Sequence, residues 1–174
     1  LALFKFYEEQ GRIKPRDKII ETTSGSAGVS FAAIGRELGY ECYVAMPAEG
    51  EQAREQAVLE YLPHQQNLIL TSADQYIAGF PEFIKPFLKD NKDFFFLNHS
   101  SGKQGSCNQI TLDSLARIAH EVLEKVPVKV FAPAVGNGSS LLGPLQGFLE
   151  SGENTFVYPF ETVQSAVVYN LLHP

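Results

Sequence analysis

The sequence predicts an α/β fold, with open parallel sheets flanked by helices in three αβα layers. Short apolar segments alternate along the chain with amphipathic segments, and glycine or proline residues separate most of them. Two Gly- and Ser-rich segments also stand where an apolar segment passes into a helical one. Because parallel strands need crossover helices, and these crossovers are right-handed, the alternation predicts a parallel sheet covered on both faces.

The elements of the first half follow from spacing and from helix stops. Apolar residues at helical spacing predict a first helix that stops at Gly11, and a turn containing Pro15 follows it. A helix that stops at Gly39, a strand broken by Pro47 and a helix stopped by Pro63 come next. The predicted strands are residues 18–22, 41–46 and 67–71, and the predicted helices after the first are residues 27–38 and 51–62.

The second half continues the same alternation. A helix is predicted over residues 74–88, interrupted or started afresh near Pro81. An apolar strand at 93–97 leads to a loop at 98–108 that is rich in Ser, Gly and Asn. A helical face around residues 112–123, an apolar segment at 128–135, a helix ending near Gly152 and a strand at 155–158 complete the chain. We expect the boundary between two lobes in the loop, with residues 1–100 forming the smaller lobe and residues 101–174 the first part of a larger one.

Composition limits the classes of partner. The formal net charge is −6, and the basic residues are scattered, so we expect no nucleic-acid or membrane partner. Two cysteines, Cys42 and Cys107, provide no disulfide framework, which favours a reducing compartment such as the cytoplasm. The chain begins at Leu1 within a predicted helix and stops at Pro174 soon after another begins, so we expect both ends to be internal to a longer protein.

Two loops have the composition of anion-binding sites. The first, called the 23–28 loop, consists of Thr23, Ser24, Gly25, Ser26, Ala27 and Gly28, and the second, called the 136–140 loop, consists of Gly136, Asn137, Gly138, Ser139 and Ser140. Each lies at a strand-to-helix junction, where free backbone N–H groups and the helix dipole favour an anion. Either loop alone is equally well explained as an ordinary turn whose Ser and Asn residues cap a helix. We expect the pair to meet at one cleft, with one loop facing a carboxylate and the other a phosphate.

The amino-acid sequence of these segments resembles that of the fold-type-II pyridoxal-phosphate enzymes, which include cysteine synthase, cystathionine β-synthase and threonine dehydratase. The family's Glu-Pro-Thr-Ser-Gly-Asn-Thr-Gly is matched by residues 21–28, and its Gly-Tyr pair and Met-Pro strand end by residues 39–40 and 46–47. Its Gly-Thr-Gly-Gly-Thr phosphate loop is matched by the 136–140 loop. The resemblance covers nearly the whole chain, and it implies the fold of the tryptophan synthase β-subunit, a homodimer and a small amino-acid substrate.

The resemblance also implies roles for individual residues. The 136–140 loop would bind the phosphate of pyridoxal 5'-phosphate, mainly through backbone N–H groups. Ser26 stands where the family has an asparagine that contacts the cofactor ring, and Ala27 stands where it has a threonine. The residues implied to bind substrate are Thr23, Ser24, Gly25, Ser26, Ala27 and His99. His99 matches a family glutamine in a divergent loop, and a solvated loop histidine is the alternative interpretation.

The lysine that holds the cofactor covalently in the family has no match in this sequence. Lys5 lies within a predicted helix and is interpreted as a surface residue, so we assign no catalytic residue and expect the chain alone to be inactive, with weak cofactor binding at most. The histidines and cysteines form no metal-ligand spacing.

Three functions remain open from the sequence. The leading hypothesis is that the whole protein performs β-elimination or β-replacement on a small, serine-like amino acid. The alternative, favoured by Ser26 and Ala27, is a non-catalytic protein that keeps the fold. An unrelated nucleotide-binding domain is weaker, because that class places an acidic residue after the second strand, where this chain has Met46 and Pro47.

Overall fold

The computed structural model describes residues 1–48, 52–102, 107–163 and 166–173. The chain forms two compact units, which are described separately below. Unit 1 consists of Leu1 and Leu3–Asn98, and unit 2 consists of Ala2 and His99–Pro174. In the described part of the chain, no helix is both long enough and apolar enough to cross a membrane.

Unit 1 is built on a sheet of four parallel strands in the order β3-β2-β1-β4. The strands are β1 (Lys18–Thr22), β2 (Glu41–Pro47), β3 (Leu68–Thr71) and β4 (Phe94–Phe96). Lys18 of β1 is paired with Glu41 of β2 on one side and with Phe94 of β4 on the other. The structure therefore confirms the predicted α/β fold with an open parallel sheet.

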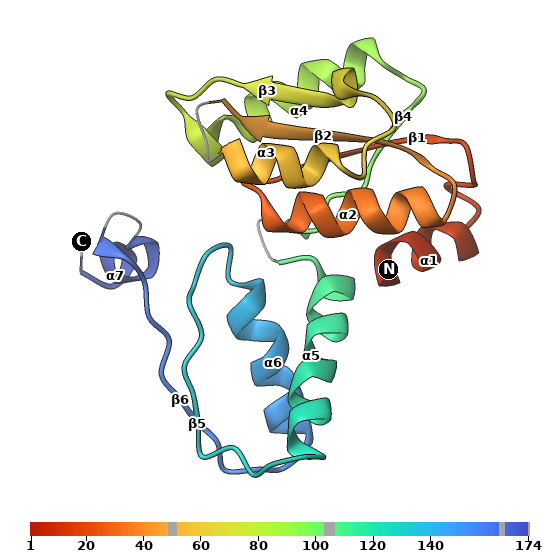
Figure 1. Ribbon diagram of the computed structural model, residues 1–174. Coiled ribbons are helices and arrows are strands. Elements are labelled where there is room, and N and C mark those ends of the chain that lie inside the picture. The colour runs from red at the N-terminus through yellow and green to blue at the C-terminus, as the bar shows by residue number, and fades with distance from the viewer. Residues whose placement is uncertain (49–51, 103–106, 164–165, 174) are drawn as a thin grey trace. The chain divides into compact units, whose positions relative to one another are not determined.

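Helices cover both faces of this sheet, with α2 and α3 on one side and α4 on the other (Figure 1). Ile19 and Ile20 are adjacent in β1, point to opposite faces and are both fully buried, which requires cover on each side. The helical elements of the unit are α1 (Ala2–Glu9), α2 (Ser26–Glu37), α3 (Gln52–Leu59), the 3₁₀ segments η1 (Gln65–Asn67) and η2 (Tyr76–Gly79), and α4 (Phe80–Asp90).

Aromatic packing attaches α1 to the unit. The ring of Phe4 is fully buried, and its centroid lies 5.7 Å from that of Phe31 in α2 and 5.1 Å from that of Tyr40. Gly11, which follows α1, has φ +64°, as expected for a residue that ends a helix. The predicted helix and its glycine stop are therefore found at these positions.

Two elements of unit 1 begin later than the sequence predicts. Asn67, the predicted start of a strand, belongs instead to η1, and its side-chain Nδ2 donates to the carbonyl of Cys42 at 2.9 Å. The predicted helix over residues 74–88 is split, so that α4 starts at Phe80 with Pro81 in its first turn. Proline is accepted there because the first N–H groups of a helix have no intrahelical partner.

Unit 2 pairs two long helices and carries two very short parallel strands. Its elements are α5 (Gln109–Leu123), β5 (Val130–Phe131), α6 (Ser139–Glu150), β6 (Phe156–Val157) and α7 (Val167–Leu172). The apolar segment 128–135 contains only the two-residue strand β5, because Pro133 has no N–H to donate, and pairing resumes at the bridge between Ala134 and Phe160. The short strands therefore follow from one residue inside the predicted segment.

The two cysteines differ in accessibility, which gives a first testable prediction. Cys42 is 1% exposed, and burial raises the pKa of its thiol to about 12, whereas Cys107 is only partly buried. A raised pKa keeps the thiol protonated below that pH, and the thiolate is the reactive species. At pH 8 we expect iodoacetamide to modify Cys107 and to spare Cys42 until urea is added. Mass spectrometry of the tryptic peptides measures both, and equal rates at the two sites in the folded protein would contradict this environment for Cys42.

Candidate functional site

The 23–28 loop joins the end of β1 to the start of α2. Gly25 has φ +154° and ψ −85°, a conformation that L side chains rarely adopt, and it is the N-cap residue of α2. Its N–H donates to Thr23 Oγ1 at 3.1 Å, and its carbonyl accepts the N–H of Gly28 at 2.8 Å. The backbone of the loop is therefore fixed by its own short hydrogen bonds and depends on glycine at position 25.

The loop presents both hydroxyl and backbone donors. Thr23 is 5% exposed, whereas the side chains of Ser24 and Ser26 are exposed and Ala27 is partly buried. Ser26 and Ala27 open α2, and the first N–H groups of a helix lack intrahelical partners. The loop can therefore offer several donors to one small anion such as a carboxylate, although Ala27 adds no hydroxyl.

Glu21 is a buried acidic residue beside this loop to which the sequence analysis assigned no role. It is 1% exposed at the end of β1, and its Oε1 accepts the N–H of Thr22 at 2.8 Å. A carboxylate that bonds the backbone just before the loop helps to fix where the loop begins. Glu21 is the first residue of the matched motif at residues 21–28, which could have drawn attention to it. Only its burial in the structure shows that the side chain points inward.

The 136–140 loop precedes α6 and carries a left-handed residue at the helix start. Gly138 is the N-cap of α6 with φ +90°, and a Cβ at Gly136 would meet no atom within 4 Å. Asn137 Oδ1 accepts the N–H of Ser139 at 3.0 Å, and Cys107 Sγ lies 3.3 Å from the carbonyl of Asn137. The sequence predicted a phosphate loop that uses backbone N–H groups, and here the Asn137 side chain already occupies one of them.

The serine hydroxyls of this loop differ. Ser140 Oγ donates to the carbonyl of Ala134 at 2.9 Å and is thereby engaged. Ser139 is 5% exposed, and among the described residues its Oγ has no hydrogen-bond partner. A buried hydroxyl without a partner costs free energy, so an acceptor such as a phosphate oxygen would satisfy it.

His99 begins unit 2, in the loop that the sequence predicted at 98–108. Asn98 before it has φ +54°, and the His99 carbonyl accepts the hydroxyl of Thr111 at 2.8 Å. Asn108 at the other end of the loop caps α5, with its Oδ1 accepting the N–H of Ile110 at 3.0 Å. Residues 103–106 of the predicted loop lie outside the described residues. The proposed contact of His99 with substrate stays a prediction.

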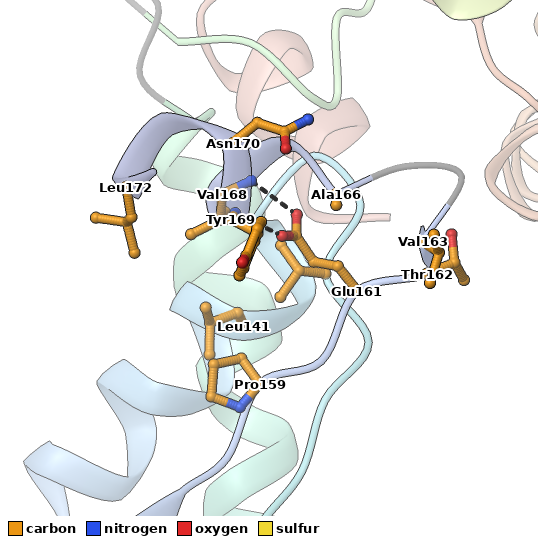
Figure 2. A pocket seen from close by; sticks show the side chains of 11 residues that line it. Leu141, Pro159, Glu161, Thr162, Val163, Ala166, Val168, Tyr169, Asn170 and Leu172 are labelled. Carbon is orange, nitrogen blue, oxygen red and sulfur yellow. Dashed lines mark hydrogen bonds between the residues drawn. The ribbon is translucent and has the colours of Figure 1, made fainter. Parts of the chain in front are cut away.

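Unit 2 contains a pocket of about 570 Å³, and some of its lining residues flank the 136–140 loop in the sequence. Figure 2 shows its mostly apolar side chains around Glu161, whose carboxylate accepts the N–H groups of Val168 and Tyr169 at 3.0 Å each. Among the described lining residues Glu161 alone is charged, and it is already engaged. The lining includes Val135 and Leu141, the residues on either side of the loop, but none of the loop's own five. We therefore assign the pocket no ligand.

The two loops lie in different units, and each is described within its own unit. Their meeting at one cleft stays a prediction. Within the described ranges, no group of three His, Cys, Asp or Glu side chains is placed to hold a metal ion.

A family comparison decides what these loops belong to. The family model described as pyridoxal-phosphate-dependent enzyme matches residues 1–174. The chain belongs to this family. The resemblance of the chain to the pyridoxal-phosphate enzymes is thereby confirmed at the level of the family, and the cofactor of the family is pyridoxal 5'-phosphate, as the resemblance implied.

Cysteine synthases are among the curated proteins to which the chain is similar. The chain is 32% identical over 95 residues to a cysteine synthase of Staphylococcus aureus, an alignment that covers 55% of this chain and 29% of the relative. It is 38% identical over 79 residues to cysteine synthase B of Escherichia coli, covering 45% of this chain and 25% of the relative. The chain therefore matches less than a third of the length of these relatives.

Solved structures share the fold over nearly the whole chain. A hydrogen sulfide-producing enzyme of Fusobacterium nucleatum gives a TM-score of 0.84 at 24% identity, covering 96% of this chain and 54% of that one. A cysteine synthase of Entamoeba histolytica gives 0.78 at 24% identity, covering 97% and 48%. At this identity the likeness shows the fold alone, and the chain spans about half the length of these structures.

The 136–140 loop of this family member fits the phosphate group of the cofactor. Gly136 leaves open space, Gly138 caps α6 with φ +90°, and Ser139 holds a buried hydroxyl without a partner among the described residues. Backbone N–H groups at a helix start and a hydroxyl donor are the groups that bind phosphate in proteins.

Arg54 is a second residue that the sequence analysis missed. It lies in α3, and its side chain packs against Gly25 of the 23–28 loop. The sequence predicts a charged, amphipathic helix after Met46 and Pro47. It does not indicate which basic residue of that helix contacts the 23–28 loop. Only the packing of α3 against α2 shows it.

Proposed function

We propose that the protein containing this chain uses pyridoxal phosphate to catalyse β-elimination or β-replacement on a small, serine-like amino acid. The observation that carries the proposal is the buried hydroxyl of Ser139, which has no partner in the part of the chain that the structure describes and lies at a glycine-containing helix start. The cysteine synthase relatives support the reaction class. When bound, the cofactor supplies an electron sink for bond breaking next to the α-carbon of an amino acid.

This chain's own residues supply binding and orientation in the proposal. Gly136, Asn137, Gly138, Ser139 and Ser140 hold the phosphate group, and Ser26 meets the cofactor ring. Thr23, Ser24, Gly25 and Ala27 hold the carboxylate of the substrate, with His99 beside it. The order of the two loops along the chain, each at a helix start, supports the assignment.

We extend the proposal to the organisation of the protein. Residues 1–100 form the substrate-binding lobe, and residues 101–174 form the first part of the cofactor-binding lobe. The whole protein forms a homodimer and acts in the cytoplasm. Turnover requires the lysine that holds the cofactor covalently in the family, and no lysine of this sequence matches it. The chain alone is therefore inactive.

Ser139→Ala in the full-length protein tests the role of the 136–140 loop. Removing a buried hydroxyl that has no partner within the described ranges is expected to leave the cofactor-free protein as stable as before, or more stable. The same change removes one donor to phosphate, so the Kd for pyridoxal phosphate, measured from its absorbance, is expected to rise about five- to tenfold. Ser114→Ala, at an exposed serine of α5, is the matched control and should change neither quantity.

The outcomes separate the parts of the proposal. Absence of any cofactor absorbance after incubation of the full-length protein with pyridoxal phosphate would end it. An unchanged Kd in Ser139→Ala would remove Ser139 from the phosphate site while leaving the family assignment intact.

A second candidate function is a non-catalytic protein that binds the cofactor or an amino acid without turnover. Ser26 and Ala27 favour it, because they replace an amide and a hydroxyl of the family motif with a shorter hydroxyl and a methyl group. Full-length protein that binds the cofactor and L-serine but releases no product from O-acetyl-L-serine would support this function over the first.

A further inference from the structure

Ser139 holds two hydrogen-bond donors at the start of α6, and they differ in whether the protein itself satisfies them. Its N–H donates to Asn137 Oδ1 at 3.0 Å. Its hydroxyl belongs to a residue that is 5% exposed, and it has no partner in the described part of the chain. The residue assigned to the phosphate site therefore has one donor that lacks an acceptor and one that a neighbouring side chain already occupies.

Asn108 at the start of α5 shows the ordinary way in which asparagine caps a helix. It is the N-cap residue, and its Oδ1 accepts the N–H groups of Ile110 and Thr111, the second and third residues of the helix, at 3.0 and 3.3 Å. Asn137 lies instead one residue before the N-cap of α6 and bonds the first helical residue. The N-cap itself is Gly138, which provides no side-chain cap to the N–H groups that follow. The start of α6 is therefore capped by a side chain at one N–H, the one that Asn137 reaches.

A second contact holds Asn137 in this position. Its carbonyl oxygen lies 3.3 Å from Cys107 Sγ, within reach of the weak thiol donor. The same Sγ would lie 3.6 Å from a Cβ at Gly138, which is an ordinary van der Waals distance. The protein's own groups thus engage Asn137 through its main chain and through its side chain, and they stabilise this arrangement of the loop when no ligand is bound.

This arrangement competes with a ligand for the same donor. A main-chain N–H is a single donor, so the N–H of Ser139 bonds either Asn137 Oδ1 or a phosphate oxygen. When only a fraction of a protein is in the binding-competent state, its apparent affinity is reduced by that fraction. We propose that the Asn137 side chain is an autoinhibitory cap of the 136–140 loop, which must release Ser139 before the loop can bind the phosphate group of the cofactor. This inference rests on the proposed function of the loop, and the main chain of Asn137 stays part of the loop in both states.

The test compares two ligands in full-length protein prepared free of cofactor. Pyridoxal phosphate carries the phosphate group, and pyridoxal has the same ring and aldehyde without it. Asn137→Ala removes the cap and keeps the main-chain N–H, whereas Asn137→Asp keeps an acceptor and gives it negative charge. Asn91→Ala in unit 1 is the matched control, because the Asn91 side chain also bonds the main chain, at the carbonyl of Phe87 at 2.8 Å. Titration of the ligand absorbance gives each Kd, and circular dichroism gives the urea midpoint of unfolding.

Asn137→Ala is expected to lower the Kd for pyridoxal phosphate about three- to tenfold, because one competing hydrogen bond is removed. Its Kd for pyridoxal should stay within about twofold of the wild-type value, since pyridoxal has no phosphate to compete for that N–H. The urea midpoint of the cofactor-free protein should fall at the same time, because an N–H of the helix start loses its cap. Asn137→Asp should raise the Kd for pyridoxal phosphate about tenfold or more, because a charged acceptor bonds the N–H more strongly and repels phosphate. Asn91→Ala should lower the urea midpoint and leave both Kd values unchanged.

A gain of affinity together with a loss of stability distinguishes this cap from a purely structural one. If Asn137→Ala weakens the binding of pyridoxal phosphate, the side chain arranges the loop for phosphate and the inference is wrong. An unchanged Kd in Asn137→Ala, or an equal change for pyridoxal, also overturns it. An unchanged Kd in Asn137→Asp does the same, whether or not Asn137→Ala folds. All these results leave the proposed function standing, whereas a wild-type protein that binds no pyridoxal phosphate overturns the proposed function and the inference with it.

Discussion

Gly147→Ala is expected to lower the free energy of unfolding by about 2–3 kcal/mol, the range of an overpacked contact. Gly147 lies inside α6, where alanine would otherwise stabilise a helix by about 1 kcal/mol. A Cβ at this position would overlap the carbonyl oxygen of Ala116 in α5 and lie 2.9 Å from the Cβ of Ala119. Backbone atoms cannot move aside as a flexible side chain can, so the two helices must separate.

Urea unfolding of the full-length protein, followed by circular dichroism, measures this loss. Leu149→Ala is the matched control on the same helix, because its side chain is 71% exposed. The control should shift the free energy of unfolding by no more than about 0.5 kcal/mol. A Gly147→Ala protein as stable as the wild type would show that α5 and α6 do not approach each other this closely in solution.

The contact at Gly147 also shows where prediction from the sequence stops. A glycine within a predicted helix reads as a weak point of that helix, and nothing local indicates a second helix against it. By contrast, the strand at Lys18–Thr22 was predicted to the residue, because a short apolar run between a turn and a glycine loop has one simple interpretation. Local pattern predicts elements, whereas the distance between elements depends on side chains far apart in the chain.

The candidate site divides in the same way. Glycine and serine content located both loops, because positive φ values at Gly25 and Gly138 and donors at helix starts leave a compositional signal. Arg54 and Glu21 left none, since their positions depend on how α3 packs on α2 and on which way a strand residue faces. Some residues that contact the 23–28 loop can therefore be found only from the folded structure.

Gly25→Ala is expected to abolish most amino-acid binding by the 23–28 loop. The backbone at φ +154° costs alanine about 1–3 kcal/mol of strain, and the new Cβ would lie 2.6 Å from Arg54 Cδ. The strained loop must then change its backbone conformation, which turns N–H donors away from a bound carboxylate. Loss of two donors corresponds to a rise of roughly 30-fold in the Kd for L-serine.

The control for Gly25→Ala must carry similar backbone strain without touching the loop. Gly39 has φ +79°, and a Cβ there would meet only Pro15 Cβ at 3.8 Å, so Gly39→Ala adds strain but no clash. Both variants should lower the free energy of unfolding, but only Gly25→Ala should lose L-serine binding. If Gly39→Ala weakens L-serine binding equally, the loss reflects general destabilisation. Binding that persists in Gly25→Ala would mean that the carboxylate does not depend on the conformation that glycine gives this loop.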